Sequence, residues 1–276
     1  MKTFLIADSG GTKTNWCFVN VKKEKRFFST QSFHPSQWSD EFKNQLHEFW
    51  KSENVPFDTT VTFYGAGCST ISNKEQLISY FRFWGFLNVT VESDLVAAGK
   101  ALYDKEKGFV AILGTGSVVF EYNNGNVSNQ IGGLGYLIGD EGSGYYFGHL
   151  FLNNLLNDNF DLELSENVYS KIGTREAILK KVYGKDGKLF ISSIALLLGD
   201  LNKLDPIQDI HIENVQLFVL KHLISKDINS IAIVGSYGYY FQNLIFEVLS
   251  FHQIDLIDTV QYPIEELTDC LLRDAF

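Results

Sequence analysis

The sequence predicts an α/β fold made of two similar halves, and three observations carry this prediction. A strand, a glycine-rich turn and a second strand open the chain at Phe4–Val21, and the same order returns at Phe109–Tyr122. Between and after them, apolar residues alternate between strand and helix spacing, which is typical of α/β proteins. A pattern that occurs twice indicates an internal repeat, and therefore two domains of related architecture.

The first half begins with a short apolar run, Phe4–Ala7, which is typical of a buried strand. Asp8–Thr14 follows as a glycine-rich turn, and Asn15–Val21 is expected to form a hairpin with the first strand. The β-branched run Thr60–Tyr64 predicts another strand, and Val89–Val91 a short one. Helical spacing of apolar residues predicts helices at Gln37–Ser52, Lys74–Trp84 and Leu95–Tyr103.

The second half repeats the opening with a strand at Phe109–Leu113, a turn at Gly114–Ser117 and a returning strand at Val118–Tyr122. The remaining expected elements are a glycine-dense loop at Gly132–Gly148, a mostly helical stretch over 146–225, a strand at Ile231–Val234 and a helix at Tyr239–Phe251. We expect an N-terminal domain over residues 1–96 and a C-terminal domain over 97–276, with the last helix, about 263–276, packed back on the N-terminal domain.

Composition limits the classes of partner. The 276 residues carry a formal net charge of −10, and the short basic run Lys22–Arg26 is expected to be the solvated end of a hairpin, so nucleic acid is excluded. Cys17, Cys68 and Cys270 lie far apart, which predicts neither disulfides nor a zinc site and fits a reducing cytoplasm. We expect no signal sequence and no membrane helix, because no apolar run approaches the roughly 20 residues required.

Two turns are candidate phosphate-binding sites. Asp8–Thr14 combines a carboxylate, two glycines whose backbone can approach a phosphate, and hydroxyls on either side of a lysine; the alternative is an ordinary glycine-rich β-turn. Gly114–Ser117 repeats the arrangement without the carboxylate. Two such turns in a duplicated frame can hold a triphosphate and its metal from both sides.

Three further positions carry chemistry. Asp94 lies between a strand and a helix, where it is either a helix N-cap or the base that accepts the proton of an attacking hydroxyl. Gly139–Gly144 contains two adjacent acids, Asp140 and Glu141, which either precede a capped helix or bind sugar hydroxyls or Mg²⁺-bound water. Gly235–Ser236 is either a helix entrance or the floor of an adenine site, with Tyr237, Tyr239 or Tyr240 for stacking.

Several common motifs are absent from the chain. It contains no G-x-x-x-x-G-K-[ST], no H-E-x-x-H and no G-x-S-x-G, and Gly65–Thr70 lacks the third glycine of a dinucleotide fingerprint. The six histidines show no metal-ligand spacing and are expected mostly at the surface or at the edge of the core.

Taken in order, the motifs resemble those of a known family. Asp8–Thr14 resembles its first phosphate motif, Leu113–Ser117 its second, and Val234–Ser236 its adenosine motif. Together with Glu92–Gly99 and Gly132–Gly144, they are similar to the N-acetylglucosamine kinases within the BadF/BadG/BcrA/BcrD ATPases of the actin/hexokinase-like superfamily.

The resemblance implies two ribonuclease H-like (actin-like ATPase) domains around a central cleft, often in a homodimer, with Mg-ATP as donor and the 6-hydroxyl of an amino sugar, most simply N-acetylglucosamine, as acceptor. By it, Asp94 is the base and Asp8 lies near Mg²⁺. The residues at the nucleotide would be Gly10, Gly11, Thr12, Lys13, Thr14, Gly114, Thr115, Gly116, Ser117, Gly235 and Ser236. Those at the sugar would be Gly67, Asp94, Gly133, Asp140 and Glu141.

The chain departs from the family pattern at two positions that lie at the sugar in relatives. Val118 and His34 stand where relatives usually have asparagine, and the loss of amide donors and acceptors bears on recognition of N-acetylglucosamine. A kinase for another sugar such as N-acetylmuramic acid, and a sensor that binds ATP and sugar without turnover, therefore stay open. An ATPase that activates a dehydratase through a shared iron–sulfur cluster needs clustered cysteines, which this chain lacks.

Overall fold

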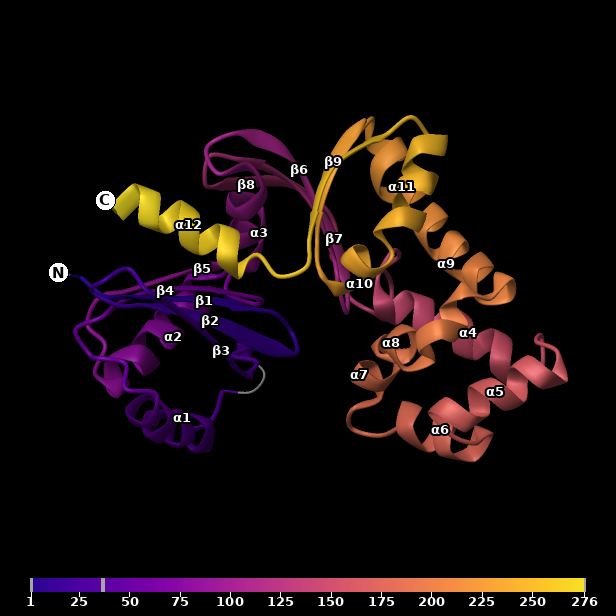
Figure 1. The fold of residues 1–276 in the computed structure, drawn as a ribbon, viewed down its shortest axis with the longest axis horizontal. Coiled ribbons are helices and arrows are strands. Elements are labelled where there is room, and N and C mark those ends of the chain that lie inside the picture. Colours follow the sequence, from indigo (N-terminus) through magenta and orange to yellow (C-terminus); the bar gives the residue numbers. More distant parts are fainter. Residues whose placement is uncertain (1, 36–37, 276) are drawn as a thin grey trace. The chain divides into compact units, whose positions relative to one another are not determined.

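The structure, a computed structural model, describes residues 2–35 and 38–275, so the predicted helix start at Gln37 lies outside the described residues. Two units divide the chain (Figure 1). Unit 1 consists of Met1–Glu106, Tyr122–Val127 and Pro263–Phe276, and unit 2 of Lys107–Glu121 and Ser128–Tyr262. The expected division at residues 96 and 97 thus differs from that of the units, because the helix after Ser93 contacts the strands of unit 1.

Unit 1 is built on a five-stranded mixed sheet in the order β3-β2-β1-β4-β5. Its strands are β1 Phe4–Ser9, β2 Lys13–Val19, β3 Lys25–Gln31, β4 Thr60–Gly65 and β5 Val89–Ser93. β2 pairs antiparallel with β1 and β3, whereas β1, β4 and β5 run parallel. Ser9, Gly65 and Ser93 lie opposite one another, so the residues that follow these three strands emerge at one edge of the sheet.

Helices cover both faces of this sheet because its central strands are apolar on both sides. Leu5 and Ala7 share a core with α1 (Asp40–Ser52) and α2 (Ile71–Trp84). Ile6 points to the other face, where α3 (Asp94–Tyr103) and α12 (Ile264–Ala275) pack. Figure 1 shows the two pairs of helices on opposite sides of the sheet. The C-terminal helix contacts α3, β1 and β2, so its residues belong to unit 1.

Unit 2 contains a second five-stranded mixed sheet, in the order β10-β9-β6-β7-β8. Its strands are β6 Lys107–Leu113, β7 Ser117–Asn123, β8 Asn126–Gly132, β9 Ser230–Val234 and β10 Asp255–Val260, and the β7–β8 tip, Tyr122–Val127, is assigned to unit 1. β6, β9 and β10 run parallel. Gly114 and Gly235, which follow β6 and β9, are therefore at the same edge of this sheet.

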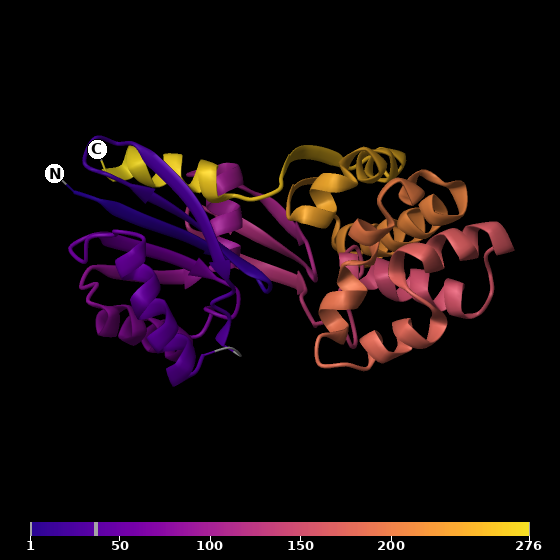
Figure 2. The same cartoon turned by 60° about the horizontal axis from the view of Figure 1, so that its bottom comes forward.

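A single large apolar core joins this sheet to the helices of unit 2. The helices are α4 Gly144–Leu156, α5 Leu162–Ile172, α6 Arg175–Val182, α7 Gly187–Ser192, α8 Ile194–Leu198, α9 Asp205–Phe218, α10 Ser236–Tyr240 and α11 Gln242–Phe251, with short 3₁₀ or π turns η2 Gly199–Lys203, η3 Val219–Leu223 and η4 Ile224–Lys226. Figure 2 shows the run from α4 to α9, coloured pink to orange, in a second view. Side-chain caps at Ser143, Asp161 and Thr174 fix where three of the helices begin.

The predicted α/β class and its two strand–turn–strand openings are confirmed. β2 begins at Lys13, so Lys13 and Thr14 belong to a strand and the first turn is shorter than expected. Three strands were not predicted, namely β3, β8 and β10. In the basic run, Lys22 and Lys23 lie in an exposed turn, and Lys25 and Arg26 begin β3. Within the described residues, no helix combines the length and the apolar character needed to cross a membrane.

Candidate active site

Two carboxylates lie at the C-terminal edge of the sheet of unit 1. Asp8 is the fifth residue of β1, and Asp94 is the first residue of α3, directly after β5. Burial and the negative charge of Asp94 raise the pKa of Asp8 to about 7, and the positive charge of Lys13 opposes this shift. The fold therefore holds two acids close enough to interact, with one lysine as compensation.

Asp94 is not the N-cap of its helix. Ser93 occupies that position without a side-chain cap bond, and Asp94 Oδ1 accepts a hydrogen bond from the Leu95 amide at 3.1 Å. Burial raises the pKa of Asp94 to about 6, although backbone amides, including that of Leu95, favour the charged form. A carboxylate with a pKa close to neutral is suited to accept a proton from a hydroxyl group.

The first turn presents Gly10, Gly11 and Thr12 at the surface. Thr14, in contrast, is buried, and its hydroxyl donates to Ser9 Oγ at 2.7 Å. The Phe33 amide donates to both hydroxyl oxygens, at 3.2 Å each. The Thr14 hydroxyl thus anchors the segment after β3, and Thr12 is the threonine of this turn with an exposed position.

The same anchoring brings His34 to the edge of the sheet. Ser32 Oγ donates to the Gly10 carbonyl at 2.7 Å and accepts from the His34 amide at 3.1 Å. A Cβ on Gly67 would stand 2.8 Å from Pro35 Cδ and 3.3 Å from His34 Nε2. One of the two positions that depart from the family pattern therefore lies directly against a residue expected at the sugar.

In unit 2, the second turn and the segment after β9 are in contact. Gly235 has a φ of +121°, and a Cβ there would stand 2.6 Å from the Leu113 carbonyl oxygen, so this position accepts only glycine. The turn itself is closed by a hydrogen bond from the Gly114 amide to the Gly116 carbonyl at 3.0 Å. The predicted phosphate turn and the predicted adenosine segment thus form one surface within unit 2.

Asp140 belongs to the same surface. Its side chain is buried, and its Oδ2 lies 2.8 Å from where a Cβ of Gly116 would stand. Burial raises the pKa of Asp140, while the Ser117 amide and Lys188 favour the ionised form. Gly116 and Asp140, which were expected at different ligands, are therefore neighbours within unit 2.

Glu141 has two partners that were not predicted from the sequence. Its two carboxylate oxygens lie 2.5 Å from Lys221 Nζ and 3.1 Å from His222 Nε2, both in the π turn η3. Burial acts to raise the pKa of Glu141, but these hydrogen bonds outweigh it and the pKa is lowered. Glu141 is thus engaged within the protein, which favours a structural role over a sugar contact.

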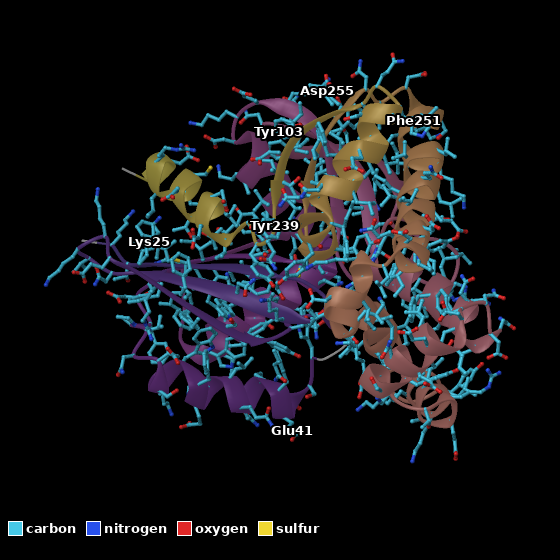
Figure 3. The ribbon with its side chains drawn as sticks, turned by 45° about the vertical axis from the view of Figure 1, so that its right-hand side comes forward. Lys25, Glu41, Tyr103, Tyr239, Phe251 and Asp255 are labelled. Atoms are coloured by element: carbon cyan, nitrogen blue, oxygen red, sulfur yellow. The ribbon has the colours of Figure 1, made fainter. Side chains whose placement is uncertain are left out.

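The tyrosines after Gly235–Ser236 differ in exposure. Tyr237 is buried, and its Oη hydrogen-bonds to His211 and Asn214, so it is not placed to stack on a base. Tyr239, labelled in Figure 3, and Tyr240 are exposed. The expectation that histidines lie at the surface or the core edge is wrong for His211, which is fully buried.

The second departure from the family pattern also lies against an expected sugar residue. A Cβ on Gly133 would stand 3.0 Å from Val118 Cγ2. In each unit, therefore, one substituted position touches one glycine of the expected sugar site, namely His34 with Gly67 and Val118 with Gly133.

The surroundings of Asp8 suit a Mg²⁺ ion that is also bound by phosphates and water, and not a metal ion held by protein side chains alone. The described residues contain no group of three or more His, Cys, Asp or Glu side chains that could hold a metal. Mg²⁺ in phosphotransfer sites is commonly bound by one or two carboxylates together with phosphates and water. Asp8 and Asp94, whose charges repel each other, match that kind of partial site.

No protein-family model matches the chain. Among curated proteins, it is 28% identical over 159 residues to an N-acetylmuramic acid/N-acetylglucosamine kinase of Clostridium acetobutylicum, a match over 54% of this chain and 51% of the relative. It is 29% identical over 199 residues to an N-acetyl-D-glucosamine kinase of Dictyostelium discoideum, over 65% of this chain and 60% of the relative. The matched region thus spans only about half to three fifths of these relatives.

Among solved structures, a provisionally named N-acetylglucosamine kinase of Porphyromonas gingivalis superposes with a TM-score of 0.91 at 25% identity, covering 99% of this chain and 100% of its own. MreB 5 of Spiroplasma citri, solved with AMPPNP, shares the fold alone, with a TM-score of 0.51 at 11% identity over 100% of this chain and 97% of its own. The chain therefore has the actin-like ATPase fold and is N-acetylglucosamine kinase-like.

Proposed function

We propose that the chain is an ATP-dependent sugar kinase that phosphorylates the 6-hydroxyl of an N-acetylated amino sugar, with N-acetylglucosamine as the first candidate. The observation that carries the proposal is the position of Asp94 at the C-terminal edge of the sheet, beside Asp8, with its pKa raised to about 6. A base of that kind is what transfer to a hydroxyl acceptor requires. The kinase names of the relatives point the same way.

In this proposal each group has a defined task. Asp94 orients the acceptor hydroxyl and takes its proton. The exposed Gly11 and Thr12, with Lys13, bind phosphate oxygens, as does the Gly114–Ser117 turn, while the Gly10 amide closes the first turn by donating to the Lys13 carbonyl at 3.0 Å. Asp8 holds Mg²⁺ through water or directly, and the bound ion supplies charge neutralisation for the phosphates. Because positioning and electrostatics dominate phosphoryl transfer, no covalent intermediate is required.

In the proposal, Asp140 and the two substituted positions contribute to the acceptor site. Asp140 accepts hydrogen bonds from sugar hydroxyls, while Val118 and His34 alter the surroundings of Gly133 and Gly67. N-acetylmuramic acid is the second candidate acceptor, because it appears in the name of the Clostridium relative. We also place the activity in the cytoplasm, where ATP is available, and propose that the chain works as a homodimer.

The test is ADP release by the purified protein with Mg-ATP and a panel of N-acetylglucosamine, N-acetylmuramic acid, glucosamine and glucose. We expect acceptor-dependent turnover that falls by about 10²- to 10⁴-fold in Asp94→Asn, with nucleotide affinity retained. Asp58→Asn, at an exposed position, is the matched control. Turnover of Asp94→Asn at the level of the control, or nucleotide binding without turnover on any sugar, would refute the assignment and favour a sensor.

A further inference from the structure

A buried side-chain amide connects the segment after β9 with the loop that contains Asp140. Tyr237 follows Ser236 directly, and its Oη lies 2.9 Å from Asn214 Nδ2. Asn214 is fully buried, and its Oδ1 accepts the Gly142 amide at 2.7 Å. Its Nδ2 also donates to the Ser143 carbonyl at 3.0 Å. One side chain of α9 thus holds both the tyrosine and the two residues that follow Glu141.

The donors and acceptors in the hydrogen bonds that join Tyr237 to His211 and Asn202 can be assigned from the partners of Asn202. Asn202 Nδ2 donates to the carbonyls of Ala195 and Gly199, at 2.7 and 2.8 Å, so its Oδ1 must accept from His211 Nε2 at 3.1 Å. His211 Nδ1 then has no proton and accepts the Tyr237 hydroxyl at 2.8 Å. The Tyr237 oxygen in turn accepts from Asn214, and every group remains neutral.

The packing around this chain of hydrogen bonds leaves it little freedom. The His211 ring stacks on Phe147, with centroids 3.7 Å apart and planes 3° from parallel, and its centroid is 4.0 Å from that of Phe241. Burial alone lowers the pKa of His211 to about 3, in keeping with a neutral ring. Buried polar groups are costly unless all of them are paired, and a fully paired network fixes the positions of its members.

We propose that Tyr237 is a positioning residue for the acceptor: through Asn214, its hydroxyl fixes the Asp140–Ser143 loop relative to Gly235–Ser236. The inference rests on the proposed kinase function and extends it to a residue that touches neither substrate. Its consequence is a crossed effect. A change made next to the nucleotide segment should weaken binding of the sugar, because the loop with Asp140 loses its anchor.

The variant that tests this is Tyr237→Phe, which keeps the packed ring and removes the hydroxyl. We expect the acceptor KM to rise about tenfold, while kcat and the nucleotide KM stay within about twofold. Asn214→Ala should raise the acceptor KM similarly, and the double variant should show little further change. Tyr122→Phe is the matched control, because Tyr122 is 1% exposed and its Oη donates to the Asp104 carbonyl at 2.8 Å. It should lower thermal stability without changing either KM.

A second measurement does not depend on turnover. Hydrogen exchange of the Gly142 amide in the ligand-free protein should be at least tenfold faster in Tyr237→Phe than in the wild type, and unchanged in Tyr122→Phe. Unchanged exchange at Gly142, or an unchanged acceptor KM, would overturn the inference, as would equal increases in both KM values. If the wild type shows no turnover on any sugar, the kinase proposal fails by itself, and the exchange measurement still decides whether Tyr237 holds the loop.

Discussion

The carboxylate of Asp140 occupies the space in front of Gly116: its Oδ2 lies 2.8 Å from the point where a Cβ of Gly116 would stand. Both residues are in unit 2, and the Ser117 amide favours the charged form of this carboxylate. The second turn and the glycine-dense loop are thus fitted to each other. A change at the turn must therefore act on the acidic residue as well.

Gly116→Ala should displace Asp140 and lower both activity and stability. We expect kcat/KM for the acceptor to fall about tenfold or more, and the free energy of unfolding to fall by about 1–3 kcal/mol, the usual cost of overpacking a filled site. Gly114→Ala provides the structural comparison, because no atom lies within 4 Å of a Cβ at that position. Denaturant unfolding of both variants checks the prediction, and equal stabilities would contradict it.

The rate should depend on pH through the two acids of unit 1. Burial, with the charge of Asp94 in the case of Asp8, raises the pKa values to about 6 for Asp94 and about 7 for Asp8. A base acts only when ionised, so kcat/KM should be constant above about pH 8, one unit above the higher pKa, and should fall at least tenfold per pH unit below about pH 6. Steady-state rates between pH 5 and 9 test this, and a profile that stays flat down to pH 5 would exclude both acids from the reaction.

Asp8→Asn should make the protein more stable and less active. The pKa of Asp8 is raised from 3.8 to about 7 in the folded state. Between these two pH values the carboxyl group is protonated in the folded protein and ionised in the unfolded chain. Its contribution is therefore neutral below about pH 4 and destabilising as the pH rises to 7. We expect the free energy of unfolding at pH 8, without Mg²⁺, to rise by about 1–3 kcal/mol.

The comparison for this variant is Asp58→Asn, at an exposed position, which should unfold like the wild type at pH 8. At pH 4 the Asp8→Asn variant should also match the wild type. Urea unfolding at the two pH values measures both differences. If Asp8→Asn lowers the free energy of unfolding at pH 8, the negative charge of Asp8 is stabilised by its neighbours and the prediction is wrong.

Much of the fold was predictable, because the central strands are apolar on both faces. Phe4–Ala7 and Phe109–Leu113 stand out as uninterrupted apolar runs next to glycine turns. The three strands that were missed, β3, β8 and β10, all lie at sheet edges, whereas the fourth edge strand, β5, was predicted. Polar residues make up half or more of each of these strands, as is common at sheet edges, so their apolar pattern resembles that of a loop.

Site residues that lie within one short segment could be predicted from the sequence. Contacts between segments that are distant in the sequence could not. The glycine turns and Asp94 can be found from local sequence, but the ion pair of Glu141 with Lys221 joins residues 80 positions apart. The burial of His211 and Asn214 could have been predicted, because both lie on the buried face of α9 together with Ile210 and Val215. Polar residues within an apolar helical stripe predict a buried network, although not its partners.

The last prediction concerns the choice of acceptor, and it starts from the contact between Val118 and Gly133. Val118 Cγ2 stands 3.0 Å from a Cβ position on Gly133, so an apolar side chain occupies a place where an asparagine amide would offer a donor and an acceptor. A site with hydrogen-bonding groups discriminates more strongly between sugars than an apolar one does, because the wrong ligand leaves those groups unpaired. Val118→Asn should therefore increase the preference for N-acetylglucosamine over glucose, as a ratio of kcat/KM values, by about three- to tenfold.

Val118→Leu separates this polar effect from a change of volume, since leucine adds bulk without an amide. It should leave the ratio within about twofold or lower both kcat/KM values together. A competition assay with both sugars in one reaction measures the ratio directly. If Val118→Asn and Val118→Leu shift the ratio alike, the contact with Gly133 acts through shape, and the acceptor is then selected elsewhere, with His34 beside Gly67 as the next position to substitute.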